Sequence, residues 1–119
     1  MAKETQKRKH DRIGSLNLLN YVCLDENNEE AVQGMGRTLN VSQGGILLET
    51  HILIDKRYNV SLSIGLEDEM VDIKGKVIYC RDGKKGKFES GIQFQGINEK
   101  SLKTLNRYII AFRELQKKG

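Results

Sequence analysis

The sequence contains no proline and no tryptophan, and its only cysteines are Cys23 and Cys80. Two cysteines make neither a disulfide framework nor a metal-ligand set, so we interpret both as reduced, small hydrophobic residues packed in the fold. No apolar run approaches membrane-spanning length, and the charged N-terminus lacks the apolar region of a signal peptide. These absences favour a cytoplasmic protein that does not insert into a membrane.

Signatures of catalysis and of metal binding are also missing. His10 and His51 have no partners at the spacing of a metal site. There is no Ser/His/Asp or Cys/His constellation, no Walker-type loop and no HExxH motif. The acidic run at residues 67–69 is typical of a solvated turn. We therefore expect no enzymatic activity, no catalytic residues and no metal ion.

The net charge of +4 is distributed unevenly along the chain. Residues 1–12 carry five Lys/Arg against two acids, and residues 99–119 carry six against two. The middle, residues 13–98, carries nine against twelve. The positive charge is therefore concentrated at the two ends of the chain. This distribution favours a local anion site over a nucleic-acid track across a sheet.

Alternating apolar and polar residues predict a mainly β fold. The pattern indicates strands at residues 16–24, 30–41, 58–65, 71–79 and 88–94, with a further strand starting at Ile46. Short strands with turn signals at near-regular intervals favour a closed or nearly closed antiparallel barrel. Gly34 and Gly36 suggest a bulge or bend at a barrel corner. The alternation also places Tyr79 on the core face of its strand.

The period of the apolar residues changes near the C-terminus. Steps of three and four residues predict an amphipathic helix with Asn98 as its N-cap. Its apolar stripe consists of Leu102, Leu105, Tyr108, Ile109, Phe112 and Leu115. We predict one domain with three parts, namely a basic arm at residues 1–12, a β-barrel at 13–98 and a helix at 99–119. The arm lacks periodicity and is expected to be flexible.

The stretch from Asn40 to Gly45 is a turn signature that leads directly into the strand at Ile46. Its Asn and Ser side chains can bond nearby backbone, and its paired glycines permit positive φ or close backbone approach. Upstream, Arg8 and Arg12 place two guanidinium groups four residues apart. We hypothesise that these two segments form one site for an anionic ligand.

Hairpin geometry supports this hypothesis. If the turn between the first two strands centres near Glu26, antiparallel partners have position numbers that sum to about 52. Arg12 then lies opposite Asn40, and directly opposed residues approach to about 5 Å. The predicted register therefore brings both segments to one rim of the barrel.

The two segments resemble the paired motifs of the PilZ domain family, which binds the bacterial second messenger cyclic di-GMP. The residues that carry the resemblance are Arg8 and Arg12 of Arg-x-x-x-Arg, Asn40, Ser42 and Gly45 of [Asp/Asn]-x-Ser-x-x-Gly, Val77-Ile78-Tyr79 and Gly91-Ile92-Gln93-Phe94. The resemblance extends from Arg8 to the terminal helix. It implies a six-stranded antiparallel PilZ-type β-barrel with a C-terminal amphipathic helix and a basic N-terminal arm.

The resemblance also implies a role for each motif residue. The ligand, cyclic di-GMP, would be bound by Lys7, Arg8, Arg12, Asn40, Ser42 and Gly45. Arginine pairs with guanine or phosphate and stacks on a base, which suits an arm that wraps a dinucleotide. Gly45 would keep a side chain out of the ligand's path. Asn40 replaces a commoner Asp, and Lys7 occupies a position that bears on whether one or two ligand molecules bind.

Three functions remain as interpretations of the sequence. The favoured one is a non-enzymatic cyclic di-GMP receptor that signals to an unidentified effector protein when its arm becomes ordered. An alternative is a small barrel that binds single-stranded nucleic acid, which would need exposed aromatic side chains. We expect no nucleic-acid partner, because the apolar patterns of the strands and the helix place the aromatic side chains of this sequence on core faces. Another alternative is a PilZ adaptor that acts without ligand.

Overall fold

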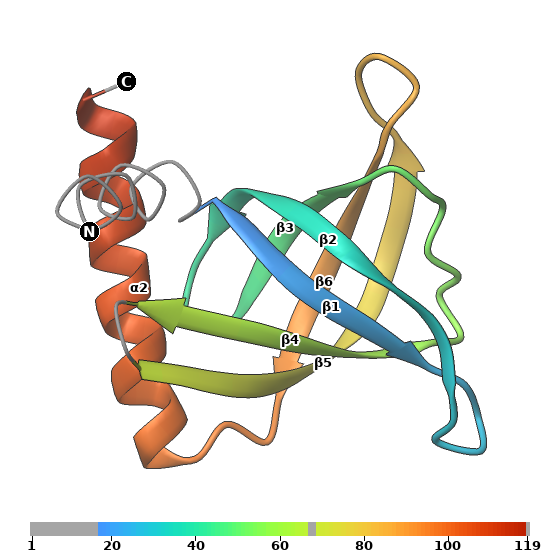
Figure 1. Cartoon of the computed structure of the whole chain (residues 1–119), viewed down its shortest axis with the longest axis horizontal. Coiled ribbons are helices and arrows are strands. Elements are labelled where there is room, and N and C mark those ends of the chain that lie inside the picture. The colour runs from blue at the N-terminus through green and yellow to red at the C-terminus, as the bar shows by residue number, and fades with distance from the viewer. Residues whose placement is uncertain (1–16, 67–68, 119) are drawn as a thin grey trace, which may run out of the picture.

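Six antiparallel strands close into a barrel, with helix α2 (Glu99–Lys118) beside it (Figure 1). The computed structural model describes residues 17–66 and 69–118. The strands are β1 (Leu18–Leu24), β2 (Glu30–Val41), β3 (Gly45–Thr50), β4 (Asn59–Leu66), β5 (Glu69–Asp82) and β6 (Phe88–Gln95). Their order around the barrel is β1-β2-β3-β6-β5-β4. The predicted six-stranded antiparallel barrel with a C-terminal helix is therefore confirmed.

The apolar side chains of the strands form one core with the inner face of α2 (Glu99–Lys118). The helix contributes Leu105, Tyr108, Ile109 and Phe112 to this core and lies against β4 and β5. Asn98 caps the helix as predicted, because its Oδ1 accepts a hydrogen bond from the Ser101 N–H at 2.8 Å. The helix is thus a packed part of the domain.

Two further findings concern the described part of the chain. None of its helices has the length and apolar character needed to cross a membrane. Within residues 17–66 and 69–118, no cluster of three or more His, Cys, Asp or Glu side chains is arranged to hold a metal ion.

The β1–β2 hairpin has a different register from the predicted one. Leu18 pairs with Arg37 and Cys23 with Val32, so partner numbers sum to 55. The turn lies later than predicted because hydrogen bonds of Asp25 stabilise it. The Asp25 N–H donates to the Glu29 carbonyl at 2.9 Å, and Asp25 Oδ1 accepts from two backbone N–H groups of the turn. The predicted register, offset by three residues, is wrong. Arg12 lies outside the described residues.

Gly34 and Gly36 do not mark a bulge, because the β1–β2 ladder is continuous around them. The glycines instead make room for neighbouring side chains. A Cβ at Gly34 would lie 2.9 Å from the Tyr21 hydroxyl, and one at Gly36 would lie 2.8 Å from Leu48 Cγ. The register shifts that involve β2 lie elsewhere, between Cys23 and Leu24 in its ladder with β1 and between Thr38 and Asn40 in its ladder with β3.

Tyr79 is not a core residue, which corrects the prediction from strand alternation. The β5–β6 ladder changes register between Val77 and Tyr79, so the alternation is interrupted at Ile78. Ile78 and Tyr79 are consequently both exposed, at 49% and 36% of their surface. The shift brings two large apolar side chains to the outer surface of the barrel.

Candidate functional site

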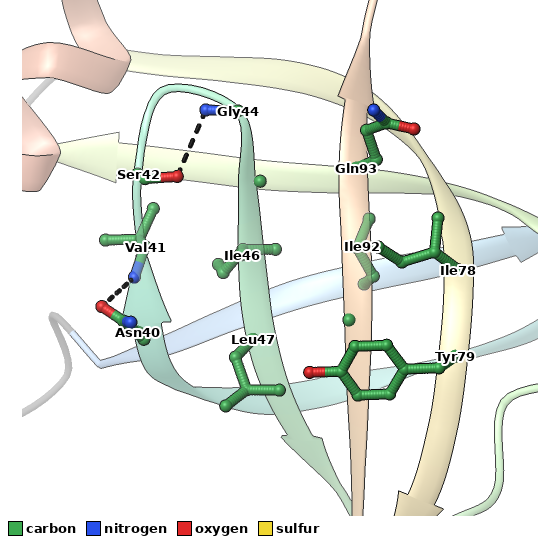
Figure 2. A pocket seen from close by; sticks show the side chains of 12 residues that line it. Asn40, Val41, Ser42, Gly44, Ile46, Leu47, Ile78, Tyr79, Ile92 and Gln93 are labelled. Carbon is green, nitrogen blue, oxygen red and sulfur yellow. Dashed lines mark hydrogen bonds between the residues drawn. The ribbon is translucent and has the colours of Figure 1, made fainter.

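A hollow of about 340 Å³ lies on the outside of the barrel where the β2–β3 turn meets β6 and β5 (Figure 2). Its size falls in the range of small-molecule sites. We call it the rim hollow. It is lined by Asn40, Val41, Ser42, Gly44, Gly45, Ile46, Leu47, Ile78, Tyr79, Gly91, Ile92 and Gln93.

Hydrogen bonds within the β2–β3 turn hold one side of the rim hollow. The Ser42 N–H donates to the Gly45 carbonyl at 2.9 Å, and Ser42 Oγ accepts from the Gly44 N–H at 3.3 Å. Asn40 Oδ1 accepts from the Val41 N–H at 2.9 Å, which directs its Nδ2 donor away from that contact. Ser42 and Asn40 are both exposed, so their polar groups can reach a ligand.

The same turn is fixed to the rest of the molecule on two sides. The Gly44 carbonyl accepts a hydrogen bond from the Phe94 N–H of β6 at 2.9 Å. Gln43 Nε2 donates to Asn106 Oδ1 of α2 at 2.8 Å. A Cβ on Gly45 would lie only 2.4 Å from the Ile92 carbonyl oxygen, so glycine is needed for the approach of β3 to β6. The turn is therefore a preorganised wall of the hollow.

Ile78 and Tyr79 form the opposite wall. The Tyr79 ring reaches across β6 toward Leu47 (Figure 2). It can do so because residue 91 is glycine, where an added Cβ would lie 2.3 Å from the ring. The Arg81 guanidinium carbon lies 5.4 Å from the ring centroid, a cation–π distance. This wall presents apolar and aromatic surface to the hollow.

Among the residues that the structure describes, none of those lining the rim hollow is Lys, Arg, Asp or Glu. Arg81, which lies against the Tyr79 ring, is paired with Glu89 at 3.0 Å. The hollow can thus accept aromatic and polar groups of a ligand. The charge of an anionic ligand would have to be neutralised by residues around it.

The structure brings together three of the six site residues predicted from the sequence. Asn40, Ser42 and Gly45 all line the rim hollow. The other three, Lys7, Arg8 and Arg12, lie outside the described residues.

Sequence reasoning missed the wall across the hollow from the turn, including Ile78, Tyr79 and Gln93. A signal for this wall was present in the sequence. Three consecutive apolar residues, Val77, Ile78 and Tyr79, interrupt the alternation of β5. Such a run is compatible with a bulge that exposes one more side chain.

Comparison with protein families gives one match. A family described as "PilZ domain" matches residues 6–111, which is most of the chain. A search of curated proteins gives no significant match.

Comparison with solved structures finds the same fold in several proteins. The PilZ domain of CeSA from a cellulose-synthesizing bacterium has a TM-score of 0.56 at 13% identity, with 81% of this chain and 93% of that chain covered. The PilZ domain of YcgR from Escherichia coli, solved with c-di-GMP, has a TM-score of 0.57 at 14% identity, with 84% of this chain and 86% of that chain covered. Borreliella burgdorferi PlzA, also solved with c-di-GMP, has a TM-score of 0.52 at 19% identity, with 83% of this chain and 36% of that chain covered.

Proposed function

Because the chain belongs to the PilZ domain family, we propose that it is a receptor for cyclic di-GMP and has no catalytic role. The observation that carries the proposal is the rim hollow, where Asn40, Ser42 and Gly45 of the second motif meet an aromatic wall. Two proteins with the same fold, the YcgR domain and PlzA, are solved with c-di-GMP. Their low identity to this chain makes the hollow itself the main support.

The lining of the hollow suits a guanine base. Guanine presents donors and acceptors on its edges and a flat apolar face. Asn40 Nδ2 and Ser42 Oγ supply polar groups on one wall, and the Tyr79 ring supplies a face for stacking on the other. We propose that one guanine occupies the hollow between these walls.

The charge of the ligand calls for the basic arm. Cyclic di-GMP carries two phosphates, and Arg8 and Arg12 can bind phosphate or guanine through their planar forks. The carbonyl of Asn17, the first described residue, accepts a hydrogen bond from the Thr38 N–H at 2.6 Å, two positions before Asn40. The five residue-to-residue steps from Arg12 to Asn17 can span at most about 17 Å. The arm therefore begins within reach of the hollow.

We further propose that the output is a protein contact. Ligand binding would order residues 1–12 over the hollow and create a surface made of arm and nucleotide. An effector protein that recognises this surface would then respond to the second messenger. Lys7, beside Arg8, would influence whether one or two ligand molecules bind.

Binding of single-stranded nucleic acid is the competing function. It requires several exposed aromatic side chains along a basic track. In the described part of the chain, Tyr79 is the aromatic residue among the exposed large hydrophobic side chains. One exposed ring in a hollow suits a single bound base better than a strand.

Calorimetric titration with cyclic di-GMP tests the proposal, with GTP and a short oligonucleotide as control ligands. We expect binding of the dinucleotide alone. Arg8→Ala and Arg12→Ala should each cost about 1–3 kcal/mol of binding, the range of a bidentate contact to guanine. Absence of heat with cyclic di-GMP, together with tight oligonucleotide binding, would reverse the assignment.

A further inference from the structure

Four of the nine Lys and Arg residues of the barrel and its loops, including all three arginines, form ion pairs with neighbouring carboxylates. Arg37 and Lys87 lie 3.0 and 3.8 Å from Glu49 Oε1. The other two pairs of the barrel and its loops are Arg57 with Asp55 and Arg81 with Glu89. A cation that already faces a carboxylate gains less from a phosphate than one that does not. An anionic ligand in the rim hollow would therefore be stabilised most by a cation that has no carboxylate partner.

Lys76 occupies the outer face of β5 next to the hollow. Residues 72, 74, 76 and 78 are all exposed, so Lys76 and Ile78 share one face of the strand. Two positions along a strand are about 7 Å apart, and Ile78 lines the hollow. Lys76 is thus one strand repeat from the aromatic wall.

The strand pairing brings Lys76 to the hollow from a second direction. Lys76 pairs with Gln93 of β6, and Gln93 pairs with Gly45 of β3. Gln93 and Gly45 both line the hollow. The row Gly45–Gln93–Lys76 runs across three adjacent strands, so Lys76 lies about 10 Å from the turn at two strand spacings. The flexible four-carbon stem of lysine can bring its ammonium group over Gln93.

The two residues that pair with Lys76 across the sheet carry no charge. Its cross-strand partners are Gln93 on one side and Asn59 on the other. Within residues 17–66 and 69–118, no carboxylate forms an ion pair with Lys76. Its ammonium group is therefore free of a carboxylate competitor.

We propose that Lys76 is a further ligand-binding residue that contacts a phosphate of the dinucleotide from the β5 side of the rim hollow. This inference rests on the proposed function, because it assigns a second cationic contact to the same ligand.

Lys74 is a matched control. It is the same residue type on the same exposed face of β5, one strand repeat further from Ile78. Its partner on β6 is Gln95, which does not line the hollow. Substitutions of either lysine change the net charge equally, so a difference between them reports position and not the overall field.

The test is calorimetric titration of the full chain with cyclic di-GMP for wild type, Lys76→Gln, Lys76→Arg and Lys74→Gln, at low and high salt. We expect Lys76→Gln to weaken binding about three- to tenfold at low salt, the scale of one charge-assisted contact near the surface. Lys76→Arg should restore most of the affinity, and Lys74→Gln should bind like wild type. The salt dependence should decrease in Lys76→Gln alone.

Two results would overturn the inference while leaving the receptor function in place. They are wild-type affinity in Lys76→Gln and equal weakening by Lys76→Gln and Lys74→Gln. If wild type itself fails to bind cyclic di-GMP, the proposed function fails first and the role of Lys76 fails with it. Thermal unfolding of each variant verifies that the exposed substitutions leave the fold unchanged.

Discussion

At the scale of single residues, the absence of a side chain at Gly45 sets how closely β3 approaches β6. An added Cβ there would lie 2.4 Å from the Ile92 carbonyl oxygen, a backbone atom that cannot rotate away. We predict that Gly45→Ala lowers the free energy of unfolding by about 1–3 kcal/mol, the usual cost of overpacking. It should also weaken ligand binding, because the turn would be displaced from β6.

Gly44 is the control for this prediction. A Cβ at Gly44 would find Ser42 Oγ at 4.0 Å as its nearest neighbour, so Gly44→Ala should change stability by less than about 0.5 kcal/mol. Urea unfolding of both variants measures the difference. Equal stability of Gly45→Ala and wild type would show that the strands separate easily at this point.

Glu49 makes the stability of the fold depend on pH. Its carboxylate is 7% exposed and accepts hydrogen bonds from Arg37 Nε at 3.0 Å and Nη2 at 3.4 Å. The Arg37 hydrogen bonds hold the pKa of Glu49 below its ordinary value. A lowered pKa stabilises the folded state above the ordinary value, about 4.3, and this contribution is lost as the pH falls through the folded-state pKa.

We therefore predict that Glu49→Gln lowers the free energy of unfolding by about 1 kcal/mol at pH 7, since Arg37 is half exposed and partly screened. The difference between variant and wild type should shrink below about pH 4 as the wild-type carboxylate becomes protonated. Urea unfolding at pH 7 and pH 3 measures both values. Glu30→Gln, a change at an exposed end of β2, serves as the control. A constant difference at both pH values would contradict the role of the carboxylate charge.

At the scale of elements, strand identity could be predicted from the sequence more fully than strand register. Period-two alternation marks a half-buried strand wherever it occurs, so β4, β5 and β6 were predicted near their observed bounds. Register depends on turn geometry, and the Asp25 side chain holds a later turn than composition indicated. Tyr79 was misplaced for a related reason, because a bulge reverses the faces of every residue beyond it.

The candidate site was also only partly predictable from the sequence. Asn40, Ser42 and Gly45 were found because a turn motif is local in sequence. Gln93 and Tyr79 reach the hollow through pairing between distant strands, which no local pattern specifies. Gly45 also has a packing role that the sequence did not indicate, since a Cβ there would collide with the Ile92 carbonyl oxygen.

A buried hydrogen bond joins β2 to α2. Thr38 Oγ1 and the Tyr108 hydroxyl lie 2.9 Å apart, and the two residues are 2% and 1% exposed. Burial raises the pKa of Tyr108, so its hydroxyl stays protonated at neutral pH. We predict that Thr38→Val and Tyr108→Phe each destabilise the fold by about 1–2 kcal/mol.

A double-mutant cycle measures the coupling between these residues. Because both variants remove the same hydrogen bond, the double variant should lose less stability than the sum of the single ones. Additive losses in urea unfolding would mean that the hydroxyl groups act through other contacts. The pair is connected to the site at both ends. Thr38 lies two residues before Asn40, which lines the rim hollow, and Tyr108 belongs to α2, whose Asn106 bonds Gln43 of the β2–β3 turn.

At the scale of the whole molecule, the charge distribution separates the barrel from its arm. Residues 1–12 have a charge of +3, five basic against two acidic residues, and offer no apolar anchor in the sequence. The described lining of the hollow supplies shape and polar groups but no ionised side chain. We therefore propose that the arm supplies positive charge to the bound dianion and becomes ordered when it binds.

We predict that hydrogen exchange at residues 5–14 slows when cyclic di-GMP binds. Ordering each backbone residue costs about 1–2 kcal/mol, so five or six ordered residues offset several kcal/mol of contact energy. The affinity should accordingly be moderate, and it should decrease at high salt because the contacts are charged and near the surface. The β5–β6 turn, Gly83–Lys87, is the internal control, since it does not line the hollow and its exchange should not change. If binding is confirmed and residues 5–14 exchange equally fast in both states, the arm does not become ordered, and the signal must reach the effector through the barrel or α2.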